Sequence, residues 1–307
     1  MGQRSLEVSE MIAVPAVRPS TGGFRAKSYW LVVMIVAMFA ITMPAAKAQG
    51  PAGIKAKSEK PKQKPEAKPE HPEIAKRRAA ERKTFSDAEI IDGFFRTVFG
   101  AEFHVAGRVD RIRKYEKPVR VYADVRAKPD RRAQLASVVA DIRSKVQHLD
   151  IAVTNKRKGA NVVITMVRDR DIEKTIRKFY GREQADRIVR SLEPQCLSGF
   201  RKDDLFRIQH SDVIIAIDAG NFIFYDCMYE ELLQALGPIN DDDELMWSMF
   251  NDEVQMGFFD IYDQYILNLL YDPRIRAGMS KDQVKELLPQ ILPDVRAWIT
   301  KVNGLTE

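Results

Sequence analysis

Residues 213–237 of this 307-residue chain read VIIAIDAGNFIFYDCMYEELLQALG. The five consecutive apolar residues at 213–217 are typical of a buried strand. Residues 228–236 instead carry large apolar side chains at every fourth position, which predicts an amphipathic helix that ends at Gly237. A strand that leads directly into such a helix is the unit from which we interpret the rest of the chain.

Strands and helices are mixed in the region before this unit, and helices alone follow it. Alternating or continuous apolar runs predict strands at 119–125, 151–153, 162–167, 205–219 and 222–224. Helical spacing predicts further helices at 87–98 with Ser86 as N-cap, 131–146, 171–180, 182–192 and 258–270, and after Ser280. We therefore predict an α+β fold with one mixed sheet and a helical C-terminal part.

The N-terminal region has the pattern of a secretory signal peptide. Residues 29–46 contain no charge, basic residues precede them, and the sequence Ala-Lys-Ala at 46–48 is a small-x-small cleavage site. We predict that residues 1–48 are removed and that the protein is exported to the periplasm. The alternative is an uncleaved signal-anchor, in which residues 29–46 hold the protein in the inner membrane.

Lysine, proline, alanine and glutamate dominate residues 49–84, which have almost no large apolar side chains. Such a segment cannot bury enough area to offset the entropy lost on folding, so we predict a disordered linker, followed by a single globular domain at 85–307. The simplest interpretation of the linker is a solvated, extended spacer. The alternative is a cationic tether, in which residues 51–84 contact the membrane surface or an anionic polymer of the cell envelope.

The formal charge of +6 belongs to the leader and the linker. Residues 85–307 contain 33 basic and 36 acidic residues, so nucleic acid is not a predicted partner of the globular part. Within it, residues 211–273 contain fourteen acids and no Lys or Arg. We interpret this asymmetry as charge pairing with the basic first half, or as an acidic surface that binds cations or basic partners.

The chain has two cysteines, Cys196 and Cys227. Both lie in the part that is predicted to be exported, where disulfides form, and no third cysteine competes. We therefore predict a Cys196–Cys227 disulfide, with two buried thiols as the alternative. The bridge would fix the helix at 228–236 against the sheet.

Three segments carry a resemblance to a known family. They are CMYEELLQALGPIND at 227–241, SMFND at 248–252 and LYDPRIRAGMS at 270–280. Together they are similar to the bacterial exported family called domain of unknown function 2927, over a core of about 196–292. This resemblance implies export but no activity.

The helix at 228–236 also resembles the zinc-binding pattern of metzincin metalloproteases, His-Glu-x-x-His-x-x-Gly-x-x-His. Glu230, Gln234 and Asn240 occupy the three zinc-ligand positions of that pattern, and Glu231 occupies the position of its catalytic glutamate. Residues 248–250 resemble the Met-turn of these enzymes, and 213–217 take the place of the edge strand beside their cleft. The resemblance implies a zincin-like scaffold in which every zinc-binding side chain is changed.

Zinc prefers imidazole or thiolate, whereas carboxylate and amide oxygens suit hard cations. We therefore expect no metal or other cofactor, with a hard cation such as calcium as the alternative. The candidate binding residues are Glu230, Gln234, Asn240 and Asp241.

These expectations together predict an exported protein that binds an envelope component or has a structural role, and that catalyses no reaction. The alternative is a metallopeptidase-like hydrolase, in which Glu231 acts as the catalytic base at a non-standard metal site.

Overall fold

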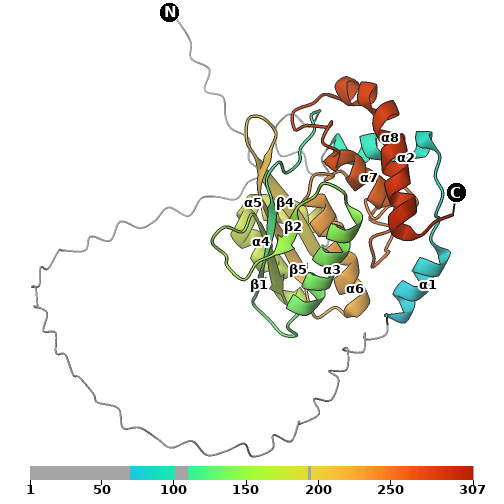
Figure 1. The fold of residues 1–307 in the computed structure, drawn as a ribbon. Coiled ribbons are helices and arrows are strands. Elements are labelled where there is room, and N and C mark those ends of the chain that lie inside the picture. The colour runs from blue at the N-terminus through green and yellow to red at the C-terminus, as the bar shows by residue number, and fades with distance from the viewer. Residues whose placement is uncertain (1–69, 101–109, 193–194, 307) are drawn as a thin grey trace, which may run out of the picture. The chain divides into compact units, whose positions relative to one another are not determined.

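The computed structural model describes residues 70–100, 110–192 and 195–306 (Figure 1). The predicted signal peptide at 1–48 and the first part of the predicted linker, 49–69, lie outside the described residues. Within the described ranges, no helix is long and apolar enough to cross a membrane.

The described part of the chain contains one mixed five-stranded sheet, as the sequence predicts. Its strands are β1 (Val119–Val125), β2 (Ile151–Val153), β3 (Val162–Val167), β4 (Cys196–Lys202) and β5 (Ile208–Ala216). Their order is β2-β1-β3-β5-β4. All neighbouring strands run parallel except β4, which pairs antiparallel with β5 at the edge of the sheet.

The predicted strand at 205–219 is wrong at its start, because the chain turns between β4 and β5. The Asp203 carboxylate accepts hydrogen bonds from two backbone N–H groups of this turn, and Phe206 has a φ of 63°. Strand β5 therefore begins at Ile208. It lies between β3 and β4, so the edge strand is β4 and not the segment 213–217 that the metalloprotease resemblance places there.

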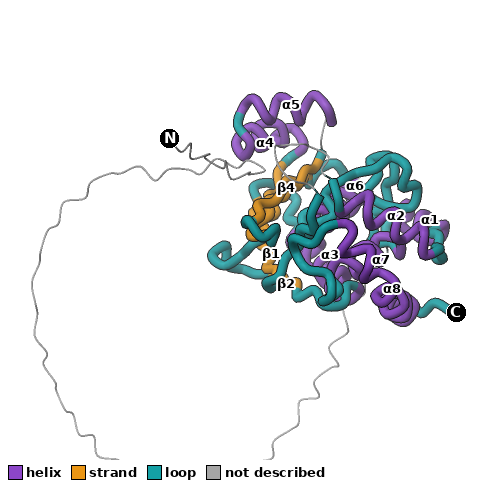
Figure 2. Tube along the Cα trace, turned by 90° about the horizontal axis from the view of Figure 1, so that it is seen from above, coloured by secondary structure: helices purple, strands orange, loops and turns teal. Residues whose placement is uncertain are grey.

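Helices cover both faces of the sheet (Figure 2). Consecutive strand residues point to opposite faces, and along β5 Val213 and Ile215 join the large core with α3 and α6. Ile214 and Ala216 join a second, smaller core with α4 and α5. These helices are α3 (Arg132–Lys145), α4 (Ile172–Tyr180), α5 (Arg182–Leu192) and α6 (Asn221–Gln234).

A helix, α1 (Pro72–Ala80), forms inside the segment that the sequence predicts to be linker. Ile74 of this helix is buried, and the Arg78 guanidinium lies 4.2 Å from the centroid of the Phe258 ring. These contacts with a distant part of the chain stabilise a segment whose composition alone does not favour folding. The linker prediction is therefore wrong over α1, and the globular part begins before Phe85.

Helix α6 begins at Asn221, so the segment 222–224 is helical and the predicted short strand there is wrong. The side chains of the segment 222–224 contact different parts of the protein. Phe224 is fully buried in the large core, whereas the Phe222 ring lies 5.0 Å from the guanidinium of Arg77 in α1. The residues at 222–224 are apolar because this helix makes contacts on several of its sides. In a short stretch of sequence, such a helix has the same pattern as a buried strand.

The helical C-terminal part consists of α7 (Ile261–Tyr271) and α8 (Lys281–Asn303), which pack with α2 (Asp87–Val98). Helix α2 begins at its predicted N-cap, Ser86, and α8 begins after Ser280, as predicted. The hydroxyls of Ser86 and Ser280 accept hydrogen bonds from the third residue of each helix, and the side chain of that residue accepts one from the cap N–H. Each capping box satisfies backbone donors that the helix itself leaves free.

The predicted disulfide between Cys196 and Cys227 is confirmed. Cys196 is the first residue of β4 and Cys227 lies in the middle of α6, with their Cα atoms 5.8 Å apart. The bond therefore ties the edge strand to the helix that follows β5.

Replacement of both cysteines should lower the free energy of unfolding by roughly 3–4 kcal/mol, because the bridge restricts the unfolded chain between residues 31 positions apart. Urea unfolding of the wild type and of the Cys196→Ser/Cys227→Ser variant measures this difference. The unreduced wild type should also show no reactive thiol after denaturation. Two reactive thiols per chain would contradict the bridge itself.

Candidate functional site

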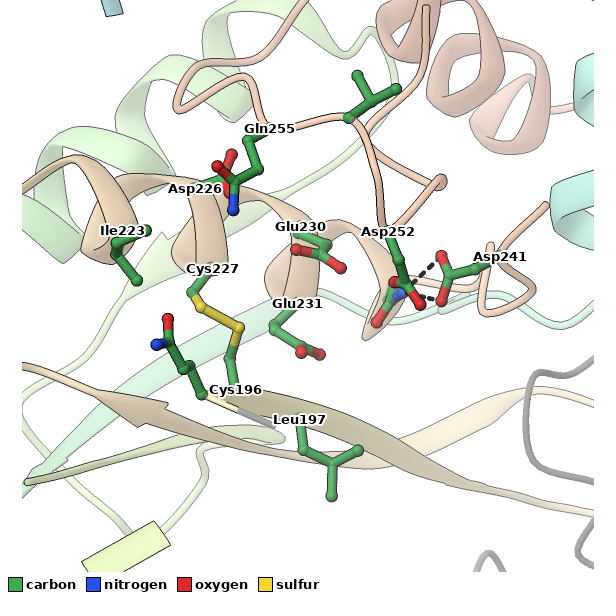
Figure 3. A pocket seen from close by; sticks show the side chains of 13 residues that line it. Cys196, Leu197, Ile223, Asp226, Cys227, Glu230, Glu231, Asp241, Asp252 and Gln255 are labelled. Atoms are coloured by element: carbon green, nitrogen blue, oxygen red, sulfur yellow. Dashed lines mark hydrogen bonds between the residues drawn. A yellow bond between two sulfur atoms is a disulfide. The ribbon is translucent and has the colours of Figure 1, made fainter. Parts of the chain in front are cut away.

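A pocket of about 240 Å³ opens beside α6, between this helix, the start of β4 and the segment that connects α6 to α7 (Figure 3). The Cys196–Cys227 disulfide forms part of its wall. Most of the remaining lining residues have acidic or amide side chains, namely Gln195, Asp226, Glu230, Glu231, Gln234, Asp241, Asp252 and Gln255. The disulfide thus holds together the two elements between which the pocket lies.

Three carboxylates meet at one end of the pocket. Glu230 comes from α6, and Asp241 and Asp252 come from the segment between α6 and α7. One oxygen from each lies within 4.8 Å of the other two. Glu230 and Asp241 are partly buried, whereas Asp252 is exposed at the rim. This arrangement leaves the carboxylate oxygens close enough to share one cation.

Gln234 positions Asp241 in this cluster. Its side-chain amide nitrogen donates to both carboxylate oxygens of Asp241, each at 2.9 Å. Its amide oxygen accepts a hydrogen bond from the Ser198 hydroxyl at 3.1 Å. Because Gln234 is only 4% exposed and both ends of its amide are occupied, it acts as a support for the cluster.

Glu231 lines the same pocket and is only 5% exposed. Its Oε2 atom is buried and has no hydrogen-bond partner among the described residues. Burial raises the pKa of Glu231 to about 8, and the charge of Asp241 adds to this effect, whereas a hydrogen bond with Ser198 opposes it. A buried acceptor without a partner costs free energy, so this oxygen would gain from a proton or a ligand.

The negative charge of the pocket has no basic counterpart among its described lining residues. Burial raises the pKa of Glu230 well above its usual value, and the charges of Glu231 and Asp241 raise it further. Burial also raises the pKa of Asp226 to about 6, although this carboxylate accepts hydrogen bonds from the backbone N–H groups of Met256 and Gly257. Such carboxylates favour the uptake of protons or the binding of a cation.

The segment that carries Asp252 is anchored to α7. The Ser248 hydroxyl donates to one oxygen of Asp263 at 2.6 Å, and the Met249 N–H donates to the other at 2.8 Å. Met249 itself is buried in the large core. The segment 248–250, where the sequence resembles a Met-turn, therefore holds the approach to the acidic cluster in place.

Four of the five site residues predicted from the sequence, Glu230, Glu231, Gln234 and Asp241, line the pocket, but Asn240 does not. The Asn240 amide nitrogen donates to the backbone oxygen of Arg96 in α2 at 2.9 Å, and its side chain lies against Gly100. Helix α6 ends at Gln234 and Gly237 has a φ of 141°, so the helical spacing assumed in the prediction does not extend to Asn240. The predicted binding role of Asn240 is therefore not supported by its position.

Asp252 and Ser198 are site residues that the sequence analysis does not identify. Asp252 follows the Met-turn-like segment, but no fixed spacing relates it to Glu230. Ser198 lies in β4, a strand that the sequence analysis does not predict. The sequence signals for Asp252 are its place in the family-like segment at 248–252 and the density of acids between 211 and 273, and neither relates it to Glu230.

Residues 87–290 match the family described as protein of unknown function (DUF2927). The chain belongs to this family. The match extends beyond the predicted core of 196–292 to include α2 and the whole sheet of this DUF2927 protein. No curated protein and no solved structure matches the chain. The similarity to metalloproteases therefore stays a prediction from the sequence.

The raised pKa of Glu231 makes stability depend on pH. Between about pH 4.5 and 8 the unfolded chain ionises this group while the folded chain keeps the proton, so stability falls as the pH rises. Replacement by glutamine removes this loss. In metal-free buffer, Glu231→Gln should be more stable than the wild type by about 2–4 kcal/mol at pH 9, and nearly equal to it at pH 4.

Chemical unfolding at a series of pH values measures this difference. Glu253→Gln is the matched control, because Glu253 is exposed and lies outside the pocket, and its curve should follow that of the wild type. A Glu231→Gln variant that is no more stable than the wild type at pH 9 would show that Glu231 is not held in a protonated state.

Proposed function

We propose that this DUF2927 protein is an exported binding protein that holds a calcium ion between Glu230, Asp241 and Asp252. The observation that carries the proposal is the convergence of three carboxylates beside the unpartnered, buried Oε2 of Glu231. Export is supported by the predicted leader and by the disulfide, since such bonds persist mainly in oxidising compartments.

The number of protein carboxylates favours calcium over magnesium. Calcium takes six to eight oxygen ligands in a flexible geometry, with carboxylates, carbonyls and waters among them. Magnesium instead keeps several waters and usually binds one or two carboxylates. The oxygens of Glu230, Asp241 and Asp252 lie within 4.8 Å of one another, so three carboxylates can share one ion, as calcium sites commonly require.

The donor set argues against zinc. Among the described residues, none of those that line the pocket is a histidine, and its two cysteines are joined in the disulfide and cannot act as thiolates. Carboxylate and amide oxygens remain, and these suit a hard cation.

The state of Glu231 argues against a peptidase. A catalytic base must be ionised to take a proton from water, and a carboxyl with a pKa of about 8 is mostly protonated at neutral pH. Glu230 is adjacent on α6, so the two side chains leave the helix about 100° apart and cannot easily act on one bond as an acid and base pair. A binding role is therefore better supported than catalysis.

Calcium should bind the full chain at one site, as isothermal titration calorimetry would measure. Asp252→Asn should weaken binding by about tenfold or more, because it removes a charged ligand without altering the buried part of the pocket. Glu253→Gln changes the next residue, an exposed acid outside the cluster, and should leave the affinity unchanged. Equal affinity for the wild type and Asp252→Asn would contradict the proposed site.

The full chain should not hydrolyse unstructured protein substrates in the presence of calcium or zinc. The reason is that the described lining residues of the pocket offer no imidazole or thiolate to hold zinc, so Glu231 has no zinc-bound water to deprotonate. A fluorescence assay with labelled casein measures hydrolysis. Activity that disappears in Glu231→Gln but persists in Glu253→Gln would instead establish the hydrolase alternative.

A further inference from the structure

A second charged crevice lies at the carboxyl ends of β1 and β3, and it shares no lining residue with the acidic pocket. Its volume is about 550 Å³. Tyr122, Ala123 and Val125 contribute apolar or aromatic surface from β1. Its basic lining residues are Arg126, Lys128, Arg132 and Arg168.

The topology of the sheet places this crevice where ligands commonly bind. β1 and β3 are adjacent and parallel. The chain leaves β1 to form α3, which packs in the large core, and leaves β3 to form α4, which packs in the smaller core on the opposite face. In sheets with parallel strands, two connections that diverge in this way open a crevice outside the strand ends, and ligands bind there.

The charges of the crevice are only partly balanced within the chain. Asp124 forms ion pairs with Arg126 and Arg157, and Asp130 forms one with Arg132. Lys128 and Arg168 form no hydrogen bond or ion pair with any described side chain. The wall therefore presents two basic side chains that are free to bind an anion.

We infer that this crevice binds a phosphate group. Lys128 and Arg168 approach it from two different segments, the loop after β1 and the end of β3. Arginine recognises phosphate through two parallel N–H donors, and lysine adds a point charge. Arg126 and Arg132 are paired with Asp124 and Asp130, so the positive charge left over among the lining residues is that of Lys128 and Arg168. The ligand is a phosphomonoester or a phosphodiester, and the site is independent of calcium.

The test is a titration of the ¹⁵N-labelled full chain by NMR, with pyrophosphate in one arm and glycerophosphoglycerol in the other. Pyrophosphate carries terminal phosphates, whereas glycerophosphoglycerol is the diester found in an anionic lipid headgroup. Saturable shifts of the amide signals of 123–127 and of Arg168 are expected in at least one arm. The arm that saturates identifies the type of phosphate.

Arg168→Gln and Lys128→Gln should each weaken binding by about tenfold or more, the loss expected for one charge-assisted hydrogen bond. Arg170→Gln is the matched control, because Arg170 is exposed, lies two residues further along the chain and does not line the crevice. Its affinity should match that of the wild type. Saturation in neither arm, or equal weakening by Arg170→Gln, would overturn the inference.

Discussion

Two adjacent glutamates on α6, the buried Glu231 and the partly buried Glu230, line a pocket that has no basic side chain among its described lining residues. The opposite side of the same helix fixes this position, because Met228 and Leu232 are fully buried in the large core. The helix cannot rotate to expose Glu230 and Glu231 without exposing these apolar side chains, which would cost several kcal/mol. The negative charge must therefore be offset where it is, by protons, by a cation or by both.

The elements around α6 hold further side chains close to these two glutamates. The disulfide at Cys227 ties α6 to the edge strand, and Ser198 of that strand supports Gln234, which in turn holds Asp241. On the other side, Asp263 of α7 anchors the segment that leads to Asp252. The edge strand β4, helix α6 and the segment between α6 and α7 thus all meet at the acidic cluster. A preformed cluster of this kind would bind the proposed cation without first having to order its ligands.

Local patterns predicted much of this fold. The α+β class and the positions of β1, β2 and β3 follow from the spacing of apolar residues. The start of α2 follows from its cap Ser86, a helix after Ser280 is predicted as well, and the disulfide follows from the predicted export of the chain. Features that depend on contacts between distant parts of the chain could not be predicted in this way. Helix α1 is stabilised by Phe258, strand β4 is not predicted at all, and the turn held by Asp203 makes β5 begin later than the predicted strand at 205–219. The site divides in the same way, since helical spacing brings Glu230, Glu231 and Gln234 together, whereas the positions of Asn240 and Asp252 are set by irregular segments.

The central claim is that a calcium ion, and not protons alone, balances the charge of this pocket. Anomalous diffraction from crystals grown with calcium, recorded at a long wavelength where calcium scatters anomalously, tests it most directly. The account predicts one strong peak within bonding distance of carboxylate oxygens from Glu230, Asp241 and Asp252. A map without a peak at that position, at a calcium concentration that saturates other calcium-binding proteins, would contradict it.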